Sequence, residues 1–358
     1  MSKLRQSCLR SLRGIRSVYY LLANAIPKSR VVRNVLVRSI LAIFSSYLLF
    51  LELYFVLPYL LEEEKYLAYG ILLFIYTCFC SSVTLCIYKD PSIRNLLLSS
   101  KSRPDWTYCL TCQTLRPPRA HHCFDCAICV LRRDHHCTIL GQCIGHANWR
   151  YFCNTLLYGL LGCAFMTYYH LTLVFHSDYF PITWSIYYKL LCMITPPGFM
   201  WLLGYLTFIQ SILFLTTCLL TLITCLLFVF IIYEFNLMVT NQTMYERTFK
   251  SFDQCYWSGS HDDDNHHTTG MKRFGKEMSS STTTSSSGST AISTSVLHHR
   301  RQQSLSNHYS SLYDIGYQNN IKQYLGEHWI LAILCPFIHS PLTTDGLSYP
   351  ISDSVKFK

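Results

Sequence analysis

The sequence predicts an all-α polytopic membrane protein with four transmembrane helices and a small, loop-rich cytosolic domain that holds two zinc ions. Three observations predict this class. Half of the 358 residues are hydrophobic and only 14% are charged, whereas soluble domains carry about a quarter charged residues. Four apolar runs are each long enough to cross ~30 Å of hydrocarbon as a helix. Between the second and third runs, Cys and His recur at fixed spacing.

The apolar runs divide the chain into alternating membrane and polar segments. Residues 257–310 are dominated by Ser, Thr, His and Asp, so they cannot bury enough apolar surface to fold. The apolar stretch from Trp329 to Ile338 is too short to span, and we expect it to pack on the core or lie at the interface. The predicted segments are a basic cytosolic N-terminal arm (1–38), transmembrane helices (39–60, 66–88, 151–175 and 207–233), a cytosolic Cys-rich zinc domain (89–150), a luminal loop (176–206), a juxtamembrane segment (234–256), a disordered Ser/Thr-rich insertion (257–310) and a C-terminal cytosolic segment (311–358).

Charge asymmetry predicts the orientation. Residues 1–38 and 89–150 contain nine Lys or Arg each, and the two intervening loops carry one each. The positive-inside rule then puts both termini and the Cys-rich domain in the cytosol, of an endomembrane (ER or Golgi) or of the plasma membrane. No basic stretch is interleaved with aromatic residues, so we expect no nucleic-acid partner. Residues 3–25 have a transit-peptide composition, but the orientation already requires a basic arm there.

Two acids lie in or near the predicted spans. Glu52 is either a functional intramembrane acid or, as we favour, a residue that faces a neighbouring helix with a hydrogen-bond partner. Glu234 lies at the membrane boundary, where an acid needs no special role.

An internal repeat in the Cys-rich domain predicts two metal sites. Each unit contains a CxxC pair, then a His, then a Cys. Every position of the second unit lies 14 residues after the matching position of the first, so the two units overlap in the sequence. Three thiolates and one imidazole suit tetrahedral zinc. Spacing alone leaves His121 and His135 as alternates to His122 and His136. The two ligand sets are Cys109, Cys112, His122 and Cys129, and Cys123, Cys126, His136 and Cys143.

Zinc is the favoured interpretation of these cysteines over a disulfide cluster, because cytosolic thiols stay reduced. Few large apolar residues lie between Cys109 and Cys143. Structural zinc contributes about 10–16 kcal/mol, which offsets the ordering cost of so loop-rich a segment.

Cys137 is left over from the repeat. It stands where a third unit would begin, but Leu140 occupies the place of the second Cys. Nearby cations and imidazole lower the pKa of a thiol, and Asp134 and His135 complete a Cys-His-Asp set of side chains. On local chemistry alone, Cys137 is either a nucleophile or an incidental thiol. Cys153, at the start of a span, is expected only to pack.

The position of Cys137 favours a nucleophile that acts on a lipid-like substrate. Only a few residues separate it from the span that begins at Tyr151. A long-chain acyl thioester fits this place, because its tail could enter the helices while its charged head stays in water.

The run from Cys109 to Phe152 resembles the DHHC-type palmitoyltransferases with a Cys-rich domain. Its signature is Asp134-His135-His136-Cys137, and the flanking Cys143-Ile144-Gly145 agrees. The tail, from Tyr313-Asp314-Ile315-Gly316 to Asp345-Gly346, is similar to the subfamily numbered twenty-four.

The resemblance implies protein S-acyltransferase activity. Acyl-CoA would be the co-substrate, and an acyl-Cys137 intermediate would pass a long-chain group, palmitoyl above all, to cysteines of membrane-associated proteins at the lipid bilayer. It implies that Cys137 is the nucleophile, His135 the general base and Asp134 its orienting carboxylate. It also selects His122 and His136 as the zinc ligands.

Departures from the family pattern leave one alternative. The family's Asp-Pro-Gly is Asp90-Pro91-Ser92 here, and Thr243-Met244-Tyr245-Glu246 replaces its Thr-Thr-x-Glu. The alternative function is a catalytically silent zinc-binding membrane adaptor, against which the intact Asp134, His135 and Cys137 argue. A transporter or channel would need more intramembrane charge than Glu52 supplies.

Overall fold

The computed structural model describes residues 29–59, 62–94, 106–176, 187, 197–248 and 312–352. Most of the predicted basic arm, most of the predicted luminal loop, the end of the juxtamembrane segment and the whole predicted insertion at 257–310 lie outside the described residues.

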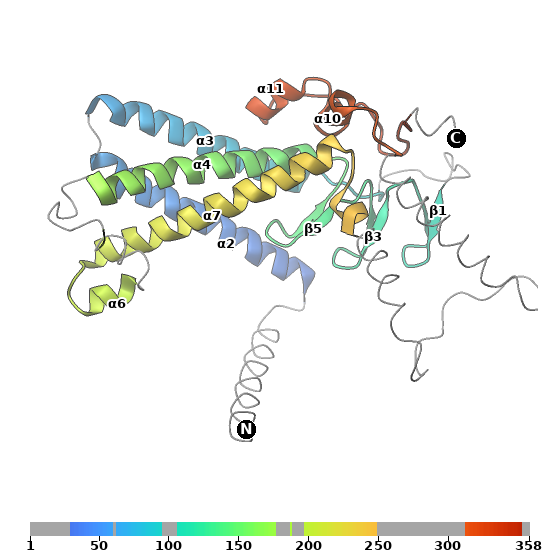
Figure 1. The fold of residues 1–358 in the computed structure, drawn as a ribbon. Coiled ribbons are helices and arrows are strands. Elements are labelled where there is room, and N and C mark those ends of the chain that lie inside the picture. The colour runs from blue at the N-terminus through green and yellow to red at the C-terminus, as the bar shows by residue number, and fades with distance from the viewer. Residues whose placement is uncertain are drawn as a thin grey trace, which may run out of the picture.

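Four long helices form a bundle at one end of the molecule (Figure 1). All four are long and apolar enough to cross a membrane, so the chain is a multi-pass membrane protein and, within the described residues, the four predicted spans are confirmed. The candidate spans are Arg30–Tyr59, Glu64–Tyr88, Trp149–Phe175 and Phe208–Val239.

The first span is built from three consecutive helical segments: α2 (Arg30–Leu51), a π-helical turn (Glu52–Val56) and a 3-10 turn (Leu57–Tyr59). At 1.5 Å per residue, its 30 residues reach ~45 Å, which exceeds a hydrocarbon core of ~30 Å. The helix begins at Arg30, nine residues before the predicted start at Ser39. These nine additional residues carry Arg30, Arg33 and Arg38.

The other three spans are the helices α3 (Glu62–Tyr88), α4 (Trp149–His176) and α7 (Phe208–Val239). The α4 helix packs against both α3 and α7. The short helix α6 (Pro197–Leu202) lies against α7 at the far end of the bundle (Figure 1). A capping box at Thr207 and Gln210 starts α7, since each side chain accepts a hydrogen bond from the other residue's backbone N–H.

Polar side chains also join the helices inside the bundle. Glu52 is fully buried, and its Oε2 lies 3.1 Å from Nε2 of His170 on α4. The other nitrogen of His170 lies 3.1 Å from the hydroxyl of Thr217 on α7. Glu52 therefore faces a neighbouring helix, as the favoured interpretation expected, but its partner there is the close imidazole of His170, and neither carboxylate oxygen has a partner in hydrogen-bond geometry among the described residues.

The described part of the Cys-rich domain forms three small antiparallel hairpins at the opposite end of the bundle from α6 (Figure 1). We call them the first, second and third hairpins. Their strands are β1 (Thr107–Cys109) with β2 (Thr114–Arg116), β3 (His121–Cys123) with β4 (Ile128–Val130), and β5 (His135–Cys137) with β6 (Gln142–Ile144).

The C-terminal segment covers the junction between bundle and hairpins (Figure 1) with α10 (Tyr317–Leu325) and α11 (Trp329–Leu334). Asn154 of α4 donates to the carbonyl of Ala332 at 2.7 Å, and the buried Arg132 donates to the carbonyl of Gln323 at 3.1 Å. Trp329 and Ile333 pack against the core around Cys137. Within the described residues, the short apolar stretch therefore packs on the core.

Candidate metal centres and active site

The three hairpins share one turn geometry. Their first cysteines, Cys109, Cys123 and Cys137, pair with Thr114, Ile128 and Gln142 in the same register. Four residues after each cysteine, Gln113, Ala127 and Gly141 adopt left-handed backbone angles, with φ of 51°, 52° and 61°. Cys137 therefore occupies in the third hairpin the place that Cys109 and Cys123 occupy in the other two.

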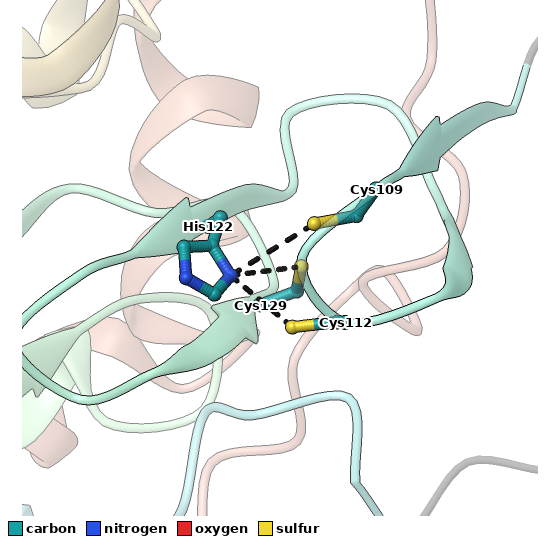
Figure 2. Close-up of side chains that lie close together, drawn as sticks. All are labelled: Cys109, Cys112, His122 and Cys129. Carbon is teal, nitrogen blue, oxygen red and sulfur yellow. Dashed lines mark hydrogen bonds between the residues drawn. The ribbon is translucent and has the colours of Figure 1, made fainter.

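The first cluster gathers around Nδ1 of His122 (Figure 2). The sulfurs of Cys109, Cys112 and Cys129 lie 3.8, 3.1 and 3.9 Å from that nitrogen. The second cluster repeats the arrangement around Nδ1 of His136, with sulfur distances of 3.7, 3.3 and 3.7 Å. Its sulfurs belong to Cys123, Cys126 and Cys143.

Both clusters fit a tetrahedral metal ion. Zinc lies ~2.3 Å from sulfur and ~2.0–2.1 Å from nitrogen, so tetrahedral geometry separates the two ligand atoms by about 3.6 Å. In the second cluster, the sulfurs of Cys126 and Cys143 are also only 3.6 Å apart. Each cluster could hold a metal ion, and among the described residues every cysteine is free of a disulfide.

The two alternate histidines lie elsewhere. The ring of His121 stacks on Tyr245 with centroids 4.2 Å apart. Nδ1 of His135 lies 2.8 Å from Oδ2 of Asp134. Because an ionised carboxylate can only accept, that nitrogen carries the proton and donates it.

The Asp134–His135 pair leads directly to Cys137. Asp134 is 2% exposed, and its Oδ1 accepts the backbone N–H of Met244 at 2.9 Å. His135 also forms a hydrogen bond with Cys137. The three residues that the sequence singled out therefore form one chain of hydrogen bonds, with the imidazole in the middle.

These hydrogen bonds and the burial of the site shift the pKa values of both His135 and Cys137. Burial alone lowers the pKa of His135, but the hydrogen bonds with Asp134 and Cys137 outweigh burial and raise its pKa to about 10. Burial acts to raise the pKa of Cys137, but His135 and the backbone N–H groups of Leu140 and Ile139 lower it below the ordinary thiol value. The environment thus favours a thiolate beside an imidazolium, the reactive form of a cysteine nucleophile.

A capping box supports Asp134 from the segment that follows α7. The N–H of Glu246 donates to the hydroxyl of Thr243 at 3.1 Å, and the N–H of Thr243 donates to Oε2 of Glu246 at 2.9 Å. Met244 is the first residue of this helical turn, so its N–H is free to reach Asp134. The departure from Thr-Thr-x-Glu at Met244 leaves this contact intact, because it comes from the backbone.

Arg119 anchors the same turn. Its Nε and Nη2 donate to the two oxygens of Glu246 at 2.7 and 2.9 Å, and its Nη1 donates to Oδ1 of Asn241 at 3.0 Å. The rings of Tyr313 and Tyr349 pack on its guanidinium at 4.5 and 5.1 Å. The Cys-rich domain, the end of α7 and the C-terminal segment therefore meet at this arginine.

Glu234 was expected to be an acid without a special role at the membrane boundary, but it lies beside Asp134 and His135. It is 3% exposed, and its carboxylate, Asp134 and His135 bring their ligand atoms within 4.8 Å of one another. Neither Glu234 oxygen has a hydrogen-bond partner among the described residues. The sequence could not reveal this contact, because it joins residues about 100 positions apart.

A largely apolar cavity of about 550 Å³ opens from the third hairpin into the bundle. All four long helices contribute to its wall, which includes Cys137 and His135 together with Phe152 and Phe230. Gly159 and Gly162 also line it, and a Cβ at these positions would contact Phe79 and Ile75 of α3 at 3.6 and 3.4 Å. Its volume lies within the range of ligand sites, roughly 300–1,000 Å³.

Comparisons with known proteins agree with these features. The family model described as DHHC palmitoyltransferase matches residues 102–251. The chain is 25% identical over 280 residues to the mouse protein named probable palmitoyltransferase ZDHHC24, covering 75% of this chain and 72% of that protein. It is 40% identical over 78 residues to the human protein of the same name, covering 22% and 28%.

A third similarity, to the palmitoyltransferase ERF2 of Candida glabrata, is 51% identity over 59 residues and covers 16% of this chain and 18% of that protein. The matched stretch is thus well under two thirds of the human and yeast relatives. Together with the family match, these similarities establish that the chain carries a DHHC palmitoyltransferase domain at residues 102–251.

Proposed function

We propose that the chain is a protein S-acyltransferase that moves a long-chain acyl group, palmitoyl above all, from acyl-CoA through Cys137 to cysteines of other proteins. The observation that carries the proposal is the hydrogen-bonded Asp134–His135–Cys137 chain on the wall of an apolar cavity between four candidate membrane helices. The acyl tail would lie in the cavity, and its thioester carbon would meet the sulfur. The mouse relative, similar along 75% of the chain, supports membership of the subfamily numbered twenty-four.

In the first half-reaction, Sγ of Cys137 attacks the thioester carbonyl carbon. His135 takes the thiol proton at the nitrogen that faces Cys137, and Asp134 holds the other nitrogen. The new carbon–sulfur bond to Cys137 forms as the bond to the CoA sulfur breaks. The CoA thiolate leaves and takes the proton from His135.

In the second half-reaction, the thiol of a substrate protein attacks the acyl-Cys137 carbonyl. His135 accepts that thiol's proton, the acyl group passes to the substrate sulfur, and Cys137 leaves as a thiolate. The proton on His135 then returns to Cys137, so the enzyme ends as it began. The substrates would be membrane-associated proteins whose cysteines reach the bilayer surface.

The two clusters would hold zinc, because their donor sets and spacings fit it. Zinc would supply structural cross-links between the hairpins. Six side chains of these clusters form or flank the turns of the first two hairpins. The other two, His136 and Cys143, lie opposite each other in the third hairpin, where His136 stands between His135 and Cys137. The second site would therefore fix the strand that carries both reactive side chains.

We further propose that the Cys-rich domain and both termini face the cytosol, of an endomembrane or of the plasma membrane. The lysines and arginines concentrated before the first span and between the second and third spans support this orientation. There, thiols stay reduced and acyl-CoA is present.

Labelling of the purified full-length protein with radioactive or fluorescent acyl-CoA tests the function. We expect wild type to take up a hydroxylamine-sensitive label and Cys137→Ser to take up none. Cys225→Ser is the matched control, because Cys225 is exposed on α7 and does not line the cavity, so its loss should not affect labelling. A wild-type protein that binds two zinc ions but never becomes labelled would instead support the adaptor.

A further inference from the structure

The guanidinium of Arg38 on α2 holds the turn of the third hairpin. Its Nε donates to the carbonyl of Leu140 at 3.0 Å. Its Nη2 lies 3.4 Å from the carbonyl of Gly141 and 3.4 Å from Oε1 of Gln142. Three consecutive residues of one turn therefore share a single side chain that comes from a membrane helix.

The helix and the turn are in close contact. Gly141 adopts a φ of +61°, and a Cβ at this position would lie 3.1 Å from the Asn34 backbone and side chain. A larger residue at position 141 would push α2 away. The close approach keeps Arg38 beside the turn.

The same turn surrounds the sulfur of Cys137. The backbone N–H groups of Ile139 and Leu140 form hydrogen bonds with Cys137. In the first hairpin, the N–H groups of Thr111 and Cys112 do the same for Cys109. Both pairs lie two and three residues after their cysteine. The nucleophile therefore lies in the kind of amide cradle that surrounds a metal-bound thiolate.

The hairpins differ in what fixes this cradle. In the first two, the fourth residue of the turn is a cysteine that would bind the same ion as the first. In the third, Leu140 stands there, and Leu140 is the residue whose carbonyl Arg38 binds. No Cys or His cluster of the described chain includes Cys137 as a ligand.

We propose that Arg38 is a positioning residue for Cys137, and that its guanidinium replaces the metal ion as the group that fixes the turn. This inference rests on the proposed role of Cys137 as the nucleophile. Arg38 holds the carbonyl side of the turn while the amide side faces the sulfur. Because Arg38 belongs to α2, the position of the first membrane helix is linked directly to the reactive sulfur.

A second arginine on α2 provides a matched control. Arg33 lies 3.9 Å from Asp125 of the second hairpin, and their side chains are 33% and 58% exposed. The second hairpin would already be fixed by zinc, so this contact should be dispensable. The comparison thus asks whether a hairpin turn depends on an α2 arginine only where the turn itself carries no pair of metal ligands.

The test compares Arg38→Gln, Arg38→Lys and Arg33→Gln in the full-length protein. Single-turnover acylation of Cys137 is measured across acyl-CoA concentrations, together with bound zinc. We expect Arg38→Gln to lower the maximal rate at least tenfold, with KM for acyl-CoA within threefold of wild type and two zinc ions retained. Arg38→Lys should recover part of the rate, since an ammonium lacks the planar fork of donors. Arg33→Gln should match wild type.

Three results would overturn the inference. An unchanged maximal rate in Arg38→Gln would show that the turn needs no such support. A raised KM with an unchanged maximal rate would make Arg38 a binding group for the charged CoA head. Loss of zinc in both Arg38 variants would make it a general stabiliser of the domain.

Alkylation of Cys137 by a small iodoacetamide, without acyl-CoA, separates this inference from the proposed function. The rate is read by mass spectrometry at that residue alone. We expect a changed rate in Arg38→Gln and an unchanged rate in Arg33→Gln, even if wild type accepts no acyl group. In that case the positioning role would stand while the acyltransferase proposal failed.

Discussion

The three hairpins share one backbone geometry, but the turn of the third is held by different groups from the turns of the first two. All three place a cysteine in the same register and a left-handed residue four positions later. The first two surround their cysteine with three further metal ligands. The third surrounds Cys137 with His135, two backbone N–H groups and, behind them, the guanidinium of Arg38.

The difference shows how a zinc-binding turn can present a reactive thiol. A metal-bound thiolate has its charge neutralised by the ion and is held for structure. Once the second cysteine is replaced by Leu140, the same turn still directs amides at the sulfur but leaves it free to react. The neighbouring His136 keeps the strand attached to a metal cluster, so the reactive residue lies next to a rigid point.

The largest expected effect is the loss of a metal-organised hairpin. Cys126→Ser removes one of four ligands of the second cluster. Structural zinc contributes about 10–16 kcal/mol, which matches or exceeds the whole stability of a typical domain, about 5–15 kcal/mol. We therefore expect bound zinc and the folded Cys-rich domain to be lost together, as measured by metal analysis and protease resistance.

Cys225→Ser is the control, because Cys225 is exposed on α7 and should leave two zinc ions bound. Unaltered zinc content in Cys126→Ser would contradict the ligand assignment drawn from the repeat.

Local pattern predicted the parts of the fold that local chemistry determines. The four helices follow from runs of apolar residues, and the two Cys/His clusters follow from a 14-residue shift, and both predictions are confirmed by the structure. Spacing could not choose between His121 and His122, because both lie on β3. The structure gathers the three sulfurs around His122, whereas His121 stacks on Tyr245, far along the chain.

The parts that sequence reasoning missed depend on contacts between distant residues. Arg119 and Glu246 are 127 positions apart, and Arg38 and Leu140 are 102 apart. Arg38, Arg119 and Glu246 are each an ordinary charge when considered alone, and Leu140 takes part only through its backbone carbonyl. The extension of α2 to Arg30 was also missed, because hydropathy marks where a helix enters lipid and not where its hydrogen bonds begin.

An intermediate effect is expected from the backbone N–H that holds Asp134. Met244→Pro removes this donor at the first position of a helical turn, where proline is tolerated. A hydrogen bond to a charged group contributes about 1.5–3 kcal/mol, so acylation of Cys137 should slow roughly 10- to 150-fold. Single-turnover labelling measures the rate, and metal analysis should still find two zinc ions.

Met244→Thr is the matched variant, because it restores the family's Thr-Thr-x-Glu and keeps the N–H. We expect its rate to stay within about twofold of wild type, as for substitutions that remove no specific contact. A large gain in Met244→Thr would show that a side-chain hydroxyl is needed and that the backbone contact is insufficient.

The smallest expected effect concerns Glu234, the carboxylate that shares the surroundings of His135 with Asp134. A buried carboxylate without a hydrogen-bond partner destabilises a fold, yet this one lies where the imidazolium forms during both half-reactions. Glu234→Gln keeps the size and removes the group that can ionise beside the imidazolium. We expect acylation to slow roughly tenfold, or about 1.4 kcal/mol, while the temperature of unfolding rises.

The opposite signs of these two changes make the Glu234 experiment decisive. A residue that only fills space would leave the rate unchanged, and a residue that supports the fold would lower the unfolding temperature when altered. Glu64→Gln, at an exposed position on α3, should change neither quantity. If Glu234→Gln is both slower and more stable, the third hairpin gives up stability to hold a charged imidazole beside Cys137, whereas the metal-organised hairpins gain stability from every ligand they hold.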